Sequence, residues 1–149
     1  DIYYTICGNG PDEDELRKLI HEKKLEKQVQ LIGFRTDMNE ILQTADVFAF
    51  PSIREGLGIA AIEALACGVP LIVADNRGTR EYLHNDKNGL ICDAFDRNAF
   101  VAAIDKVYSN VEYRKKLADY CRESVIQFST EETVRTMERI YSTMDKRIS

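Results

Sequence analysis

The sequence predicts an α/β domain of the Rossmann type, in which helices cover both faces of a parallel sheet. Short, almost continuously apolar runs recur along the chain, as expected for strands buried on both faces. These runs alternate with stretches of helical periodicity, the pattern of repeated strand–helix units. A length of 149 residues suits one domain with a substantial hydrophobic core.

The first third of the chain reads as three strands separated by two helices. Buried strands are expected at residues 2–7, 29–34 and 45–50. The first strand stops at the run Gly8-Asn9-Gly10-Pro11, and Asp12 can cap the helix that follows. The apolar positions of that helix are Leu16, Leu19, Ile20 and Leu25. A short second helix is expected after Asp37.

The rest of the chain adds two strands and a set of helices. A small, apolar helix runs through Ala66, and Gly68 is placed to end it. Strands are expected at Leu71–Ala74 and residues 90–92, with a short helix at residues 81–83 between them. Three helices follow at Arg97–Ser109, Val111–Ser124 and residues 130–146. Because no strand separates these last helices, we expect them to pack around one side of the sheet.

Composition argues against several classes of partner. The net charge is −5 and the isoelectric point is near 5.1, which argues against nucleic acid because phosphate binding needs a basic surface. The four cysteines form no CxxC pair, and the two histidines lie in no ligand pattern, so we expect no metal site and no cofactor. These cysteines are Cys7, Cys67, Cys92 and Cys121, and reduced thiols of a cytoplasmic protein are expected.

No targeting segment is recognisable. No apolar run reaches the ~18 residues that a membrane span needs, and the chain opens on Asp1 without a basic, signal-like region. Because an expected core strand begins at once, we expect residues 1–149 to be an N-terminally truncated piece of a longer protein. Contact with the inner face of a membrane is expected only through that longer protein.

The segment from Ser52 to Glu63 combines two glycines with two carboxylates. Gly56 and Gly58 lack a Cβ and precede a helix, whose N-terminal amides and dipole favour an anion such as a diphosphate without a metal. If the intervening chain were helical, Glu55 and Glu63 would lie ~12 Å apart along the axis, too far to share a proton. They could instead hold the two ends of a sugar–diphosphate–ribose ligand.

The alternative is that both acids are ordinary surface residues. Glu55 would then be a helix-terminus acid and Glu63 a solvated one. The neighbours of Glu63 in sequence are almost all apolar, and a buried, unpaired carboxylate is costly. We therefore expect Glu63 to need a partner, which favours the ligand-binding reading.

The segment resembles the E-x7-E motif of GT-B glycosyltransferases. It runs Pro51-Ser52-Ile53-Arg54-Glu55-Gly56-Leu57-Gly58 and continues through Ile62-Glu63-Ala64-Leu65-Ala66-Cys67-Gly68-Val69-Pro70. It is most similar to the retaining family 4, the glycosyl transferases group 1 type. Three further segments agree with that family in order and spacing: Ile6-Cys7-Gly8-Asn9-Gly10-Pro11, Val29-Gln30-Leu31-Ile32-Gly33-Phe34 and Asn88-Gly89-Leu90-Ile91. The resemblance covers about residues 2–145.

The resemblance implies a role for each matching position. It makes the chain the C-terminal, donor-binding half of a GT-B fold, whose partner is a nucleotide-diphosphate sugar. Glu55 would be the catalytic residue that contacts and positions the donor sugar, and Glu63 would bind the ribose. The backbone of Gly56, Leu57 and Gly58 would contact the diphosphate. Gly33, Phe34 and Arg35 would lie beside the base, and Gly8 and Gly10 would line the same cleft.

The resemblance also shows what is absent. The family's half begins earlier, with a strand–helix unit that carries a basic pair for the donor phosphates, and an N-terminal acceptor domain precedes it. Neither is present here, so we expect these residues alone to be inactive. The resemblance also implies a hexosyltransferase of capsule, exopolysaccharide or glycoconjugate synthesis.

One segment and two alternative functions stay open. The run Asp75-Asn76-Arg77-Gly78-Thr79-Arg80-Glu81 is similar to runs in capsule-building members and favours a UDP-sugar, but it also fits a turn with surface salt bridges. The alternative functions are a nucleotide-sugar epimerase of related fold and a binding module without transferase activity.

Overall fold

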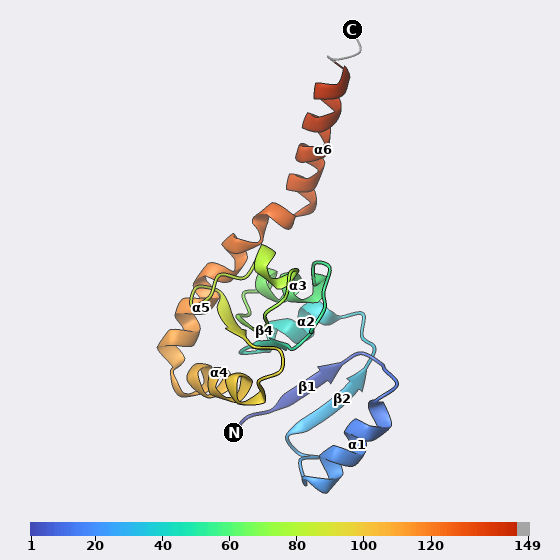
Figure 1. The fold of residues 1–149 in the computed structure, drawn as a ribbon, viewed down its shortest axis with the longest axis vertical. Coiled ribbons are helices and arrows are strands. Elements are labelled where there is room, and N and C mark those ends of the chain that lie inside the picture. The colour runs from blue at the N-terminus through green and yellow to red at the C-terminus, as the bar shows by residue number, and fades with distance from the viewer. Residues whose placement is uncertain (146–149) are drawn as a thin grey trace. The chain divides into compact units, whose positions relative to one another are not determined.

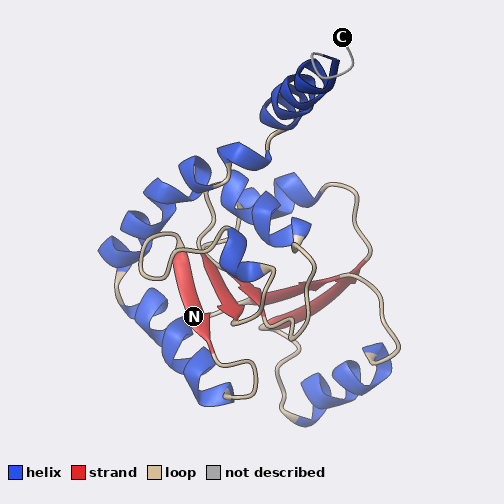
Figure 2. Cartoon of the chain, turned by 45° about the horizontal axis from the view of Figure 1, so that its top comes forward, coloured by secondary structure: helices blue, strands red, loops and turns tan. Residues whose placement is uncertain are grey.

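The chain divides into two units, Asp1–Met38 (unit 1) and a second unit that begins at Asn39 (unit 2). We describe a computed structural model of residues 1–145 (Figure 1). Strands alternate with helices from Tyr4 to Ser109, and only helices follow in the described residues. Figure 2 shows the helices in blue and the strands in red. All paired strands are parallel, which confirms the predicted α/β class of the Rossmann type.

Unit 1 consists of one helix and two paired strands. Its elements are β1 (Tyr4–Cys7), α1 (Glu13–Glu22) and β2 (Val29–Gly33). The register pairs Tyr4 with Val29 and shifts between Ile6 and Cys7. The prediction of a buried strand over residues 2–7 is wrong, because β1 begins at Tyr4 and Tyr3 is 71% exposed. One helix and two strands cannot cover both faces of their own sheet.

Two details of α1 also differ from the prediction. Asp12 makes no side-chain cap hydrogen bond, because its backbone lies at φ −90° and ψ 9° rather than in the extended region that a capping residue needs. The helix ends at Glu22, so Leu25 lies beyond it. The Leu25 amide donates to the Ile20 carbonyl at 2.9 Å, which closes the end of the helix.

Unit 2 carries a three-stranded sheet and most of the helices. Its elements, of which α2 starts at the unit boundary, are α2 (Met38–Gln43), β3 (Phe48–Phe50), α3 (Ile59–Ala66), β4 (Leu71–Ala74), η1 (Thr79–Glu81), β5 (Gly89–Cys92), α4 (Arg97–Ser109), α5 (Val111–Ser124), η2 (Ile126–Phe128) and α6 (Thr130–Asp145). The strand order is β3-β4-β5, so β4 is central. Every residue of β4 is buried.

Both faces of this sheet are covered, as predicted. Ile72 of β4 packs with Leu90 of β5, and Val107 of α4 and Leu117 of α5 cover them. Leu71 and Val73 point to the opposite face because side chains alternate along a strand. That face is covered by α3, which contacts β3 and β4 and buries three of its own side chains: Ala61, Ala64 and Leu65.

Sequence predicted one sheet, and the described residues form two, β1-β2 and β3-β4-β5. Apolar runs identify strands but do not say which strands are hydrogen-bonded neighbours. The strand predicted at residues 45–50 is also shorter, at Phe48–Phe50, because the amides of Thr44 and Ala45 still bond to carbonyls of α2.

The prediction that the last three helices share one side of the sheet is right for two of them. Helices α4 and α5 lie side by side, whereas α6 contacts η2 and runs away from the strands of unit 2 (Figure 1). Five of its large apolar side chains stay exposed: Val134, Met137, Ile140, Tyr141 and Met144. Periodicity predicts an apolar helix face but not what covers it. The predicted last helical residue, Lys146, lies outside the described residues.

Candidate functional site

The loop at residues 52–58 joins the carboxyl end of β3 to the start of α3, the place where parallel sheets bind ligands. Its residues adopt no regular structure, so the ~12 Å helical separation of Glu55 and Glu63 does not apply. The Glu55 side chain is half-buried, and Ser52 Oγ donates to its Oε2 at 3.2 Å. The same Ser52 hydroxyl lies 3.1 Å from the carbonyl oxygen of Arg54. A single, long hydrogen bond is thus all that holds the Glu55 carboxylate in the described residues.

Gly58 ends this loop in a conformation that favours glycine. Its φ is +81° and its ψ is +60°, the left-handed region. A Cβ at this position would stand 2.7 Å from Tyr82 Oη, 3.0 Å from Glu55 Cγ and 3.1 Å from Phe50 Cε1. Position 58 therefore favours glycine for two reasons. The backbone angle is strained for other residues, and neighbouring atoms already occupy the space that a methyl group would need.

The N-terminus of α3 is open to a ligand. No side chain caps it, and the Gly58 carbonyl accepts from the amides of Ala61 and Ile62. The first two helical amides, of Ile59 and Ala60, find no acceptor within residues 1–145. Free amides together with the helix dipole suit an anion.

Glu63 lies on the exposed side of α3. The buried face of the helix is formed by Ala61, Ala64 and Leu65, so the apolar neighbours of Glu63 in sequence do not surround it in space. Its carboxylate makes no hydrogen bond or salt bridge with any described residue. The premise that Glu63 is buried among apolar residues is therefore wrong, and its binding of a ligand stays a prediction. Glu63 stays available to a ligand, and equally to water.

Sequence reasoning missed the support beneath this loop. Asn76 Nδ2 donates to the Ser52 carbonyl at 2.7 Å, and Thr79 Oγ1 donates to the Ala74 carbonyl at 3.0 Å. A Cβ on Gly78 would stand 2.9 Å from the Glu55 carbonyl oxygen, so the two backbones touch. Asn76 and Thr79 are buried and bond to each other. The loop after β4 thus fixes the backbone that carries Glu55.

The charged side chains of the same loop form a surface salt bridge. Arg80 donates to both carboxylate oxygens of Asp75, at 2.7 and 2.9 Å, and holds the pKa of Asp75 below its usual range. The surface salt bridge that the sequence left open for residues 75–81 is present, whereas the preference for a UDP-sugar stays a prediction. The exposed charges form a surface pair, while the buried polar residues support the site.

Tyr82 is a second residue that sequence reasoning did not single out. It was expected to be nothing more than part of a helix, yet its side chain is 0% exposed and its hydroxyl makes no hydrogen bond with any described residue. Burial, followed by the nearby Glu55, raises the pKa of Tyr82 to about 12. No local signal marks this residue, because its closeness to Gly58 depends on the path of η1.

The predicted base-side residues gather in unit 1. The Gly8 amide donates to the Gly33 carbonyl at 2.8 Å, which joins the ends of β1 and β2. Phe34 is 75% exposed, and Arg35 donates from Nε to Asp37 at 2.8 Å. Gly10 has open space where a Cβ would stand. That these residues face the same ligand as the loop at residues 52–58 stays a prediction.

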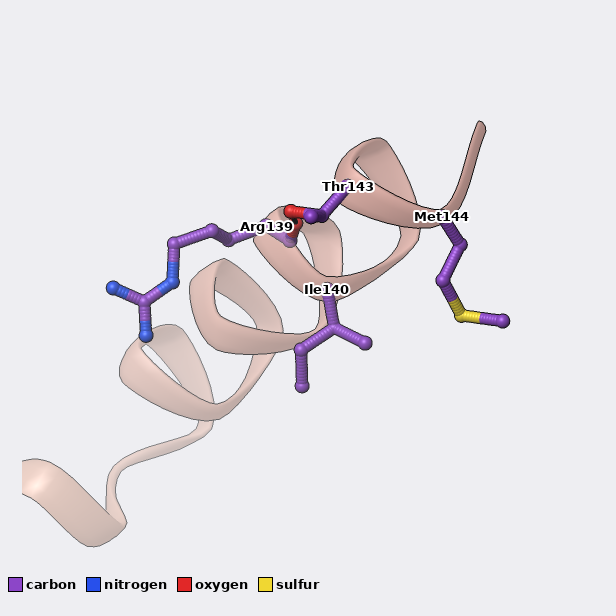
Figure 3. A pocket seen from close by; sticks show the side chains of 4 residues that line it. All are labelled: Arg139, Ile140, Thr143 and Met144. Carbon is purple, nitrogen blue, oxygen red and sulfur yellow. Dashed lines mark hydrogen bonds between the residues drawn. The ribbon is translucent and has the colours of Figure 1, made fainter. Parts of the chain in front are cut away.

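Two of the surface hollows within residues 1–145 lie away from this loop. One, of about 320 Å³, lies along α6 between side chains of that single helix (Figure 3): Arg139, Ile140, Thr143 and Met144. The other, of about 370 Å³, lies past the carboxyl ends of β4 and β5, where Asp75 and Phe95 line it. The side chains in the first all come from one helix and enclose nothing (Figure 3).

Within residues 1–145 no three His, Cys, Asp or Glu side chains gather as a metal ion would need. None of the described helices has the length and apolar character needed to cross a bilayer.

The curated proteins that this chain resembles include bacterial glycosyltransferases. EpsD of Bacillus subtilis (strain 168), described as a glycosyltransferase, is 36% identical over 93% of this chain and 36% of its own length. LpsE of Rhizobium meliloti (strain 1021), a lipopolysaccharide core biosynthesis glycosyltransferase, is 30% identical over 87% of this chain and 38% of its own length. The chain therefore spans little more than a third of the curated relatives that it matches.

A solved structure agrees with these relatives. A mutant of TarM from S. aureus, crystallised with UDP among its ligands, superposes with a TM-score of 0.85 at 26% identity. The match covers 93% of this chain and 29% of TarM.

The sequence model of the family described as "Glycosyl transferases group 1" matches residues 1–124, most of the chain. The predicted GT-B resemblance, made from the Glu55–Glu63 segment and three glycine-containing turns, is thereby confirmed. The chain belongs to the glycosyl transferases group 1 family.

Proposed function

We propose that residues 1–149 are the donor-binding part of a retaining glycosyltransferase that moves a hexosyl group from a UDP-sugar to a hydroxyl acceptor in polysaccharide or glycoconjugate synthesis. The observation that carries this proposal is the uncapped N-terminus of α3, flanked by one carboxylate before it and one on its exposed side. Family membership supports transfer of a sugar, and the UDP in the TarM complex and the name of LpsE support the donor and the pathway class.

The diphosphate is the centre of the proposed binding mode. The free amides of Ile59 and Ala60 and the dipole of α3 stabilise its negative charge, which grows as the sugar leaves. Gly56 has open space where a Cβ would stand, which lets the phosphates approach the backbone closely. Because these amides are fixed before the ligand arrives, they need no reorganisation during the reaction. In this mode the helix N-terminus takes the place of a metal ion.

The two carboxylates hold the ends of the donor. Glu55 accepts hydrogen bonds from hydroxyls of the sugar and positions it, while Glu63 accepts from the ribose hydroxyls. The exposure of Glu63 without a protein partner leaves both of its oxygens available for this role. The base is proposed to contact Gly33, Phe34 and Arg35 of unit 1, with Gly8 and Gly10 as further ligand-facing residues of that unit.

The proposal assigns no general base and no acceptor site to these residues. The chain covers little more than a third of the length of its curated relatives. Detection of sugar transfer by the full-length protein separates the transferase from the binding module. Release of an epimerised sugar would favour the epimerase.

Calorimetry of the full-length protein tests the ribose contact. UDP should bind more tightly than GDP or ADP, and Glu63→Ala should weaken UDP roughly tenfold, the usual effect of losing a hydrogen bond to a charged group. Replacing UDP by 2′-deoxy-UDP should weaken binding to the wild type but leave Glu63→Ala unchanged, since the contact is already gone.

Glu123→Ala is the matched control, because Glu123 is also an exposed helix carboxylate without an ion pair in the described chain. It should bind UDP like the wild type. If no nucleotide binds, the proposed function fails. If Glu63→Ala binds as tightly as the wild type, only the role of Glu63 fails.

A further inference from the structure

The Tyr82 hydroxyl is a buried donor without an acceptor, beside the loop that carries Glu55. Tyr82 is fully buried, and its Oη makes no hydrogen bond with any described residue. Leaving such a group unsatisfied is costly, so native proteins rarely do so without a reason. The nearest part of the proposed site is Gly58, whose missing side chain leaves room for the hydroxyl.

Tyr82 Oη and the Glu55 side chain both lie next to the position that a Cβ on residue 58 would occupy. The position that a Cβ on residue 58 would occupy is 2.7 Å from Tyr82 Oη and 3.0 Å from Glu55 Cγ. The carboxylate is turned toward Ser52 instead, whose hydroxyl lies 3.2 Å from it. Rotation of the Glu55 side chain about its own bonds is one route that would bring an acceptor to the tyrosine.

The tyrosine itself is held in place. Its ring meets the ring of Phe128 edge-on, with centroids 6.4 Å apart, and its carbonyl accepts from Asn88 Nδ2 at 2.8 Å. The donor is therefore rigid and Glu55 is the movable partner. Because Oη is sealed from solvent, a ligand oxygen arriving from outside cannot reach it directly.

We infer that Tyr82 is a positioning residue, which donates a hydrogen bond from its hydroxyl to the Glu55 carboxylate when the donor sugar is bound. The hydrogen bond leaves the remaining oxygen lone pairs of Glu55 for the sugar hydroxyls. No proton is transferred, since the phenol stays neutral: burial raises its pKa to about 12. This inference rests on the proposed contact between Glu55 and the sugar.

Tyr82→Phe tests the inference because it removes only the oxygen and keeps the ring against Phe128. The full-length protein is titrated by calorimetry with UDP and with the tightest binder among UDP-glucose, UDP-galactose and UDP-N-acetylglucosamine. The ratio of the UDP-sugar affinity to the UDP affinity measures the sugar contact alone. Tyr82→Phe should lower this ratio about tenfold and leave the UDP affinity unchanged.

A double-variant cycle shows whether Tyr82 acts through Glu55. Glu55→Ala should lower the same ratio, and adding Tyr82→Phe to Glu55→Ala should lower it no further. Tyr113→Phe is the control, because it removes a hydroxyl that already donates to Asp86 elsewhere in unit 2. It should leave the ratio unchanged.

Each of the following outcomes would overturn the inference. An unchanged ratio in Tyr82→Phe means that the hydroxyl has no part in sugar binding. An equal loss in the wild-type and Glu55→Ala backgrounds means that Tyr82 acts through packing and not through Glu55. If neither UDP nor any UDP-sugar binds the wild type, the proposed function itself fails, and the inference fails with it.

Discussion

The structure constrains residue 58 both by its backbone angle and by the atoms around it. Gly58→Ala forces an L-residue to φ +81° and places a methyl group 2.7 Å from Tyr82 Oη. The two other near atoms, Glu55 Cγ at 3.0 Å and Phe50 Cε1 at 3.1 Å, leave the methyl group no side to move toward. Both effects destabilise the folded state, and the substitution also disturbs the entry to α3.

The magnitude follows from these two effects. The left-handed backbone costs an L-residue roughly 1–2 kcal/mol, and overpacking of a filled site typically costs about 1–3 kcal/mol. We therefore expect Gly58→Ala to lower the free energy of unfolding by about 2–5 kcal/mol. For a chain of this size each kcal/mol lowers the melting temperature by roughly 2–4 °C.

Urea denaturation of the wild type and three variants separates the two effects. Gly58→Ala combined with Tyr82→Phe removes the nearest atom, so it should recover part of the overpacking loss but none of the backbone loss. Gly56→Ala is the matched control, because that glycine has open space around a Cβ and no positive φ. It should change stability by less than about 1 kcal/mol.

Two results would refute this reasoning. If Gly58→Ala is as stable as Gly56→Ala, the left-handed backbone and the crowded pocket are not features of the folded protein. If the double variant is no more stable than Gly58→Ala, Tyr82 Oη does not stand against residue 58.

Three further predictions concern the core of unit 2. Asn88 is fully buried and donates to the Tyr82 carbonyl and to Ser124 Oγ, so Asn88→Ala should lower the unfolding free energy by about 3 kcal/mol; a loss below about 0.5 kcal/mol in urea melts would contradict this. The pKa of Tyr82 is raised from 10.0 to about 12, so the neutral phenol contributes stability that is complete below pH 10 and declines as pH rises through 12. Unfolding free energies measured between pH 10 and 12 should therefore fall less steeply in Tyr82→Phe, and parallel curves would count against the buried hydroxyl. Burial raises the pKa of Cys121 to about 12, so iodoacetamide followed by peptide mass mapping should label half-buried Cys7 and Cys67 in the folded protein, and Cys121 only in urea. Labelling of native Cys121 at the rate of Cys67 would show that its environment is open.

Local signals predicted most of the elements of unit 2. The strand Leu71–Ala74 has the predicted bounds because its continuous apolar run is buried on both faces. Helix Arg97–Ser109 also has its predicted bounds, and Asp96 caps it by accepting from the amides of Asn98 and Ala99. Where the local signal was ambiguous the prediction failed: Asp12 looks like a capping residue, but the turn before it gives the wrong backbone angle.

Only part of the candidate site could likewise be predicted from the sequence. The segment that contains Glu55, Gly58 and Glu63 is contiguous, so its composition alone pointed to an anion at a helix N-terminus. The residues that support it from β4 onward could not be found, because Asn76 lies 24 residues from Ser52 in sequence and reaches it only in the folded chain. Tyr82 was missed for the same reason. The exposure of Glu63 was misjudged because neighbours in sequence on a helix do not share a face.

Donor binding by this chain depends most on the free amides at the start of α3. Amide NMR of the full-length protein during a UDP titration tests them directly, since a diphosphate bound there must shift the resonances of Ile59 and Ala60. We predict that these two shifts are among the largest, that inorganic pyrophosphate reproduces them, and that the amides of Val134 and Met137 on α6 stay unchanged. Saturation with UDP that leaves Ile59 and Ala60 unmoved while other amides shift would contradict the claim that this helix N-terminus binds the donor.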